Sequence, residues 1–116
     1  MIHEESVIQR ACVQWFRLSH RGMSGLLFSV PNGAKMSITQ AKVMKAEGLL
    51  SGVSDLILLY PSSKYHGLCV EMKTVKGRQS DSQREFQRSV EEAGYKYIIC
   101  RSIDDFIREI GKYLSE

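Results

Sequence analysis

The sequence predicts an α/β fold in which a mixed four-stranded sheet is flanked by helices. Residues 68–75 alternate between two kinds of side chain, the two-residue period of a strand. Residues 4–19 and 102–114 instead place apolar side chains at helical spacing. A turn-rich stretch at 61–67 joins two strands directly, whereas a helix separates the last two strands. The sheet should therefore contain both antiparallel and parallel pairs.

The first half of the chain predicts two helices and two strands. A helix spans residues 4–19, and its inward stripe should be Ile8, Ala11, Cys12, Trp15 and Leu18. A strand at 26–30 ends at the turn signal Pro31-Asn32-Gly33. Residues 37–47 form a second helix that Gly48 stops, and Gly52 precedes a strand at 55–60.

The second half should add the remaining two strands and two helices. Ser80 and Gln83 form a capping box that opens a helix ending near Ala93. Residues 96–100 read as a buried strand parallel to residues 68–75. Ser102 caps the last helix, whose inward side chains should be Phe106, Ile107, Ile110, Tyr113 and Leu114.

Composition indicates an ordinary soluble domain. The 116 residues are 43% hydrophobic and 25% charged, and this length predicts a single domain spanning 1–116. No apolar run approaches the roughly 20 residues that span a membrane, and the N-terminus lacks the pattern of a signal peptide. Cys12, Cys69 and Cys100 are isolated in the sequence. Cys12 and Cys100 fall on apolar stripes and suggest core thiols in a reducing compartment, so we expect a cytoplasmic location.

Two acids and a lysine form the most informative pattern. Asp55 opens a nearly all-apolar strand, and Glu71 and Lys73 lie on the same side of the next one. Along that strand, Glu71 and Lys73 are about 6–7 Å apart at roughly 3.3 Å per residue. A hairpin through residues 61–67 can bring all three groups together.

These residue types match the needs of metal-assisted phosphodiester chemistry. Mg²⁺ prefers oxygen ligands, which Asp55, Glu71 and the backbone carbonyl of Met72 can supply. Lys73 can hold an attacking water or neutralise charge in the transition state. The alternative is a surface ion pair between Glu71 and Lys73. That alternative leaves Asp55 unexplained, because an acid at the start of an apolar strand needs a partner or a metal.

The order Asp, then Glu-x-Lys on the next strand, resembles the signature of PD-(D/E)XK nucleases, and the wider context resembles their VRR-NUC branch. Similar stretches run in family order along the chain: Glu5-Ser6-Val7-Ile8-Gln9, Pro31-Asn32-Gly33, Ala46-Glu47-Gly48, Gly52-Val53-Ser54-Asp55-Leu56, Gly67-Leu68-Cys69-Val70-Glu71-Met72-Lys73, Lys76-Gly77-Arg78-Gln79-Ser80-Asp81-Ser82-Gln83 and Glu92-Ala93-Gly94-Tyr95. Ser54 stands where the family usually has proline, and Ala34 stands where it has a second glycine.

The resemblance implies a restriction-endonuclease-like core and a wider site. It makes Glu5 a third carboxylate at the metal, with Gln9 one helical turn away, although acids are also common in a first helical turn. It places Gln83 near the metal, where Gln83 orients water or phosphate; capping with Ser80 is the other role for this glutamine. The implied cofactor is Mg²⁺ or Mn²⁺.

Basic side chains surround the acidic centre in sequence. The net charge is +3 and the pI near 8.8, which is mildly basic. Contacts to the DNA backbone are expected from cations on the first helix, in the segment before Asp55 and just after Lys73. They are Arg10, Arg17, Arg21, Lys35, Lys42, Lys45, Lys76 and Arg78. Each cluster taken singly is also compatible with a solvated face.

The predicted function is metal-dependent endonucleolytic hydrolysis of DNA. The resemblance implies selectivity for branched DNA such as four-way (Holliday) junctions or flaps, in a bacterial or phage setting. A homodimer would suit a two-fold junction, since each strand needs a cut. The alternatives are a nicking or restriction-like nuclease, a catalytically silent DNA-binding module, and a structural protein in which Glu-x-Lys is only an ion pair.

Overall fold

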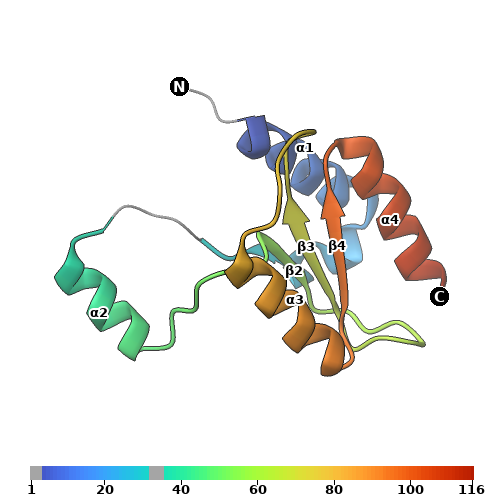
Figure 1. The fold of residues 1–116 in the computed structure, drawn as a ribbon. Helices are drawn as coiled ribbons and strands as arrows, with labels where there is room; N and C mark the ends of the chain where they lie inside the picture. Colours follow the sequence, from blue (N-terminus) through green and yellow to red (C-terminus); the bar gives the residue numbers. More distant parts are fainter. Residues whose placement is uncertain (1–3, 32–35) are drawn as a thin grey trace.

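A mixed sheet of four short strands organises the chain, whose computed structural model describes residues 4–31 and 36–116 (Figure 1). The spatial order of the strands is β1-β2-β3-β4. The first two pairs are antiparallel and β3 pairs with β4 in parallel, as the sequence predicts. The strands are β1 (Leu27–Ser29), β2 (Leu56–Leu58), β3 (Leu68–Met72) and β4 (Lys96–Cys100).

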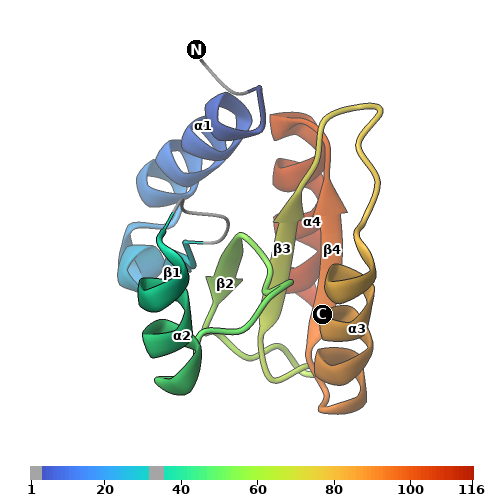
Figure 2. The ribbon, with the colours of Figure 1, turned by 60° about the vertical axis from the view of Figure 1, so that its left-hand side comes forward.

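Helices cover both faces of the sheet (Figures 1 and 2). The helices are α1 (Glu4–Ser19), α2 (Ile38–Ala46), α3 (Asp81–Glu92) and α4 (Ile103–Ser115). Helices α1 and α4 pack on one face, whereas α3 packs beside β4 on the other. Because both faces are covered, all five residues of β3 are buried. A polar side chain on this strand is therefore removed from water whichever way it points.

The main core lies between the sheet and the pair α1 and α4. Every second strand residue contributes to this core, because alternate side chains point to the same face of the sheet. The helices contribute large side chains that are fully buried: Phe16, Phe106, Ile110 and Tyr113. The predicted inward stripe of α4 is confirmed for Phe106, Ile110 and Tyr113, which are buried, whereas Ile107 and Leu114 are half-buried.

Two details of the first helix differ from the prediction. Its buried residues are Cys12 and Phe16, whereas Leu18 is 62% exposed. Cys12 and Phe16 are four residues apart and so share the face that meets the core. A 3-10 helix (η1, Arg21–Leu26) follows α1. Arg21 therefore lies on η1, whereas the sequence pattern placed it with the cations of the first helix.

The three cysteines are free and buried, which confirms the expectation for Cys12 and Cys100 and adds Cys69. Burial raises the pKa of Cys12 to about 11 and that of Cys100 to about 12, so both stay protonated at neutral pH. Burial also raises the pKa of Cys69. In the described part of the chain, no helix combines the length and hydropathy needed to cross a membrane.

Helix α2 stands apart from the sheet (Figure 1). Its capping box is complete: Gln40 N–H donates to the Ser37 hydroxyl, and Ser37 N–H donates to the Gln40 side chain. No residue of α2 is buried, and no other described helix or strand packs extensively against it. Several of its apolar side chains are exposed, among them Ile38 at 78% and Val43 at 52%.

Substitution of Gly52 tests how the loop before β2 is held. Gly52 has φ +86, and a Cβ atom there would collide with the backbone of Ser82 at the start of α3. We expect Gly52→Ala to lower the free energy of unfolding by about 3 kcal/mol, measured by chemical denaturation. Gly111→Ala is the matched control. A Cβ atom at position 111 meets open space within α4, so this variant should raise the free energy of unfolding by about 0.5–1 kcal/mol. Equal stability of Gly52→Ala and the wild type would contradict this packing.

Candidate metal centre and active site

Asp55 and Glu71 lie opposite each other on neighbouring strands. The register pairs Leu56 with Val70, and extending that antiparallel ladder by one residue pairs Asp55 with Glu71. Asp55 Oδ2 accepts a 2.6 Å hydrogen bond from the backbone N–H of Met72. Because the N–H and C=O of a strand residue point to the same side, the Met72 carbonyl faces the same edge as Asp55. The hairpin thus brings the predicted oxygen ligands together.

Glu71 is a completely buried carboxylate. Its exposure is 0%, and its Oε1 atom accepts a hydrogen bond from the Tyr97 hydroxyl. The other oxygen, Oε2, forms no hydrogen bond but lies 3.4 Å from Lys73 Nζ, with which Glu71 forms an ion pair. The Lys73 side chain is itself only 12% exposed. Glu71 and Lys73 therefore form the ion pair considered above, but both partners are withdrawn from water and the pair does not lie on the surface.

Like charges converge at Asp55. Burial raises the pKa of Asp55 above its usual value, and the hydrogen bond from Met72 N–H opposes that rise. The negative charges of Glu71 and Glu5 raise the pKa of Asp55 further, whereas Lys73 lowers it. One ammonium group therefore faces a cluster of carboxylates. A bound cation would relieve this imbalance.

Glu5 approaches this cluster from the first turn of α1. It is half-buried, whereas its neighbour Glu4 is exposed, which favours Glu5 as the acid that faces the centre. Gln9, one turn later, is also half-buried. Within residues 4–31 and 36–116, however, no three His, Cys, Asp or Glu side chains lie close enough to form a ready-made ligand set. Glu5 influences Asp55 electrostatically without completing a closed cage.

Ser80 and Gln83 form the capping box that the sequence predicted. Gln83 N–H donates to the Ser80 hydroxyl, and Ser80 N–H donates to Gln83 Oε1 at 2.8 Å. Gln83 is half-buried at the start of α3. The capping role of this pair is confirmed, whereas a role of Gln83 in catalysis stays a prediction.

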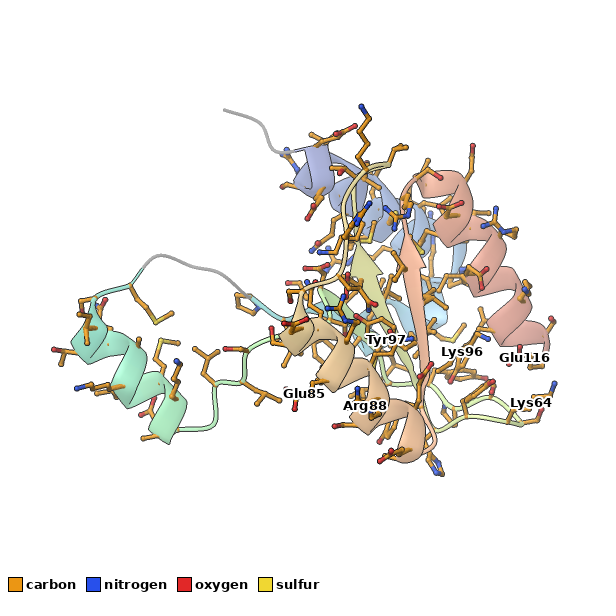
Figure 3. All side chains as sticks on the ribbon, in the orientation of Figure 1. Lys64, Glu85, Arg88, Lys96, Tyr97 and Glu116 are labelled. Atoms are coloured by element: carbon orange, nitrogen blue, oxygen red, sulfur yellow. The ribbon has the colours of Figure 1, made fainter. Side chains whose placement is uncertain are left out.

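Tyr97 is a functional candidate that sequence reasoning missed. It lies on β4 with its side chain toward α3, where its ring meets Phe86 edge-on (Figure 3). Burial and the adjacent Glu71 carboxylate raise the pKa of the Tyr97 phenol, so it remains protonated and donates to Glu71. A tyrosine inside a buried strand was a usable signal, because a buried hydroxyl needs a partner.

Arg101 is a second residue that the sequence did not reveal. Its Nη1 atom donates to the carbonyls of Thr74 at 2.6 Å and Gly77 at 2.8 Å. These carbonyls belong to the loop that follows β3. A Cβ atom on Gly77 would lie 3.3 Å from Lys73 Cδ, so this loop also packs on the stem of the lysine. Arg101 therefore fixes the backbone that surrounds Lys73.

The predicted DNA-binding cations are exposed at several places. Arg10 and Arg17 line an open groove between α1 and β1, whose other residues include Gln9, Val13, Leu18 and Phe28. Lys76 and Arg78 are exposed on the loop after β3, and Lys42 and Lys45 are exposed on α2. Arg21 is exposed on η1. Lys35, with Asn32, Gly33 and Ala34 of the predicted turn, lies outside the described residues.

The donor set fits a hard divalent cation. Its atoms are carboxylate and carbonyl oxygens, which Mg²⁺ and Mn²⁺ prefer. The buried Glu71 Oε2 atom forms no hydrogen bond and has only the ion pair with Lys73, so a bound cation would supply an interaction that burial leaves unmade. The arrangement of Asp55, Glu71 and Lys73 can therefore hold a metal beside an ammonium group.

Comparison with known proteins agrees with this geometry. The family model described as the VRR-NUC domain matches residues 2–104. A solved structure described as a VRR_NUC domain protein superposes with a TM-score of 0.85 at 22% sequence identity, covering 99% of this chain and 91% of that chain. No curated protein matches the chain. With most of its length matched, the chain belongs to the VRR-NUC domain family and has that family's PD-(D/E)XK-like nuclease fold.

Proposed function

We propose that residues 1–116 act as one nuclease domain that hydrolyses phosphodiester bonds of DNA endonucleolytically with Mg²⁺ or Mn²⁺. The observation that carries this proposal is the buried Glu71 carboxylate, whose Oε2 atom faces Lys73 without a hydrogen bond. Membership of a nuclease domain family supports the reaction class. We place this activity in the cytoplasm of a bacterial or phage-infected cell, and the free thiols support a reducing compartment.

Asp55, Glu71 and the Met72 carbonyl would hold the cation, and Glu5 would reach it from α1. When bound, a divalent metal lowers the pKa of a water, polarises the phosphoryl oxygen and stabilises the leaving oxygen. Gln83 and Gln9 would assist at this centre, and the capping box with Ser80 would hold Gln83 in place. Fit of the donor atoms and the charge imbalance at Asp55 support this assignment.

Lys73 is the proposed catalytic lysine. In hydrolysis, water oxygen adds to phosphorus while one bridging P–O bond breaks, so negative charge grows on the phosphoryl oxygens. A desolvated ammonium group near that position stabilises the charge more strongly than one in bulk water would. The packing of Gly77 against the lysine stem, with the loop held by Arg101, limits where Nζ can move.

The groove between α1 and β1 supplies a path for the DNA backbone. Arg10 and Arg17 flank it, and Gln9 at its end lies one helical turn from Glu5. The exposed Lys76 and Arg78 would contact phosphates on the other side of the centre. Such contacts read backbone position and shape and not base identity, which supports selectivity for DNA structure over DNA sequence.

A homodimer acting on four-way junctions or flaps is the form of this activity that we favour. A nine-residue helix such as α2 is marginal in water by itself and depends on packing. The exposed Ile38, Val43 and Met44 on α2 offer apolar surface that a second copy would cover. Two copies would present two centres, one for each strand to be cut.

Replacement of Lys73 tests the reaction. We expect Lys73→Ala to reduce the cleavage rate of a labelled junction or flap by at least about 100-fold, because a charge-stabilising donor is lost. Rates would be measured with Mg²⁺, Mn²⁺, Ca²⁺ or EDTA on linear duplex, single strand, flap and junction. Lys64→Ala, an exposed lysine on the β2–β3 loop, is the control and should cut like the wild type. No cutting by the wild type with Mg²⁺ or Mn²⁺ would favour a silent binding module, and preference for linear duplex would favour another specificity.

Substitution of the two groove arginines tests the proposed path of the DNA backbone. Arg10→Ala and Arg17→Ala should each weaken binding to every DNA in the panel and reduce the slope of log K against log salt by about 1. Arg108→Ala is the control, because Arg108 lies on α4 and pairs with Asp105. Fluorescence anisotropy at several salt concentrations, in Ca²⁺, provides the affinities. Unchanged salt slopes in both groove variants would exclude this path.

Charged substitutions on α2 test the proposed homodimer. Light scattering coupled to size exclusion should give a dimer for the wild type and a monomer for the Val43→Glu and Met44→Glu double variant, since two charges would enter an apolar interface. Leu59→Glu is the control. Leu59 lies outside α2 and is 54% exposed, so a charge there should leave the dimer intact. A monomeric wild type at micromolar concentration would contradict the dimer.

A further inference from the structure

The two oxygens of the Glu71 carboxylate have different surroundings. Oε1 accepts a hydrogen bond from the Tyr97 hydroxyl. Oε2 is buried, has no hydrogen bond and lies 3.4 Å from Lys73 Nζ. Tyr97 is only 7% exposed, so water does not compete freely for its hydroxyl. Of the two oxygens, therefore, Oε2 is the one without a hydrogen bond and the one that faces a cationic group.

We propose that Tyr97 is a positioning residue that fixes the rotation of the Glu71 carboxylate, so that Glu71 binds the metal through Oε2 alone. This inference rests on the metal centre of the proposed function. A group that hydrogen-bonds a metal-binding side chain controls its orientation and its affinity for the metal. Tyr97 performs that task from β4, the strand next to the one that carries Glu71.

Tyr97 is itself held on two sides. Its ring packs edge-on against Phe86 of α3, with centroids 6.4 Å apart. Gln79 Nε2 lies 3.4 Å from the Tyr97 oxygen and 2.9 Å from Gln87 Oε1, so this amide donates to both. With its oxygen accepting from Gln79, the phenol directs its own proton to Glu71. The position of the carboxylate thus depends on α3 and on the loop that precedes it.

Removal of the phenol oxygen has a definite consequence. In Tyr97→Phe, Glu71 Oε1 becomes a buried acceptor without a donor, and the carboxylate is free to rotate toward Lys73. Loss of a group that orients a metal ligand lowers metal affinity by roughly 10- to 100-fold. A role of Tyr97 confined to packing predicts no such loss, because phenylalanine keeps the ring against Phe86.

Calorimetric titration of Mn²⁺ into the whole protein without DNA is the test. We expect Tyr97→Phe to bind Mn²⁺ at least about 10-fold more weakly than the wild type, and cleavage to require a correspondingly higher Mn²⁺ concentration for half its maximal rate. Tyr95→Phe is the matched control. The Tyr95 ring meets His66 edge-on, and its hydroxyl forms no hydrogen bond with Glu71 among the described residues, so this variant should bind like the wild type. Circular dichroism establishes that each variant is folded at the titration temperature.

The outcomes separate this inference from the proposed function. Equal Mn²⁺ affinity of Tyr97→Phe and the wild type would overturn the positioning role alone. Weaker binding by Tyr97→Phe supports it even where the wild type binds Mn²⁺ and cuts no DNA, a result that would contradict only the hydrolytic function. A wild type that binds no Mn²⁺ contradicts both. If Tyr97→Phe does not fold, Gln79→Leu takes its place, and unchanged Mn²⁺ affinity in that variant overturns the role.

Discussion

A buried negative charge on Glu71 is the constraint to which the surrounding elements are fitted. Removing a carboxylate from water costs several kcal/mol unless partners replace the lost hydration. Here β4 supplies a hydroxyl through Tyr97, and β3 itself supplies an ammonium group through Lys73. One oxygen is still left without a hydrogen bond, and Asp55 adds a second acid across the ladder. A metal-free centre of this kind carries an excess of negative charge that a divalent cation removes.

The fold explains why this charge can be held in place. Strand β3 is central in the sheet and is covered by α1 and α4 on one face and by α3 on the other, so its side chains have little freedom. The loop after β3 is fastened by Arg101, which donates to three of its carbonyls. The loop before β2 rests on the start of α3 at Gly52, where a side chain would not fit. Rigid supports on both sides keep Asp55, Glu71 and Lys73 in register, and a catalytic centre depends on such positioning.

Much of this arrangement could be predicted from local patterns. The two-residue period of residues 68–75 placed Glu71 and Lys73 on one side, and the turn-rich residues 61–67 indicated the antiparallel partner that brings Asp55 opposite Glu71. The capping box of α3 followed from its sequence as well. Tyr97 and Arg101 could not be placed in the same way, because their partners are 26 and 24–27 residues away and depend on the parallel register of β3 and β4. The burial of Glu71 likewise depends on helix packing over both faces, which the alternation of one strand does not specify.

The most direct test of the central claim is the location of a bound cation. Crystals of the protein grown with Mn²⁺ and measured at the manganese absorption edge would give an anomalous peak at the cation. We expect one principal peak within coordination distance of Glu71 Oε2 and an Asp55 oxygen, with Tyr97 still donating to Glu71 Oε1. A structure at saturating Mn²⁺ with no peak at this position, and with Glu71 Oε2 paired only to Lys73, would contradict it.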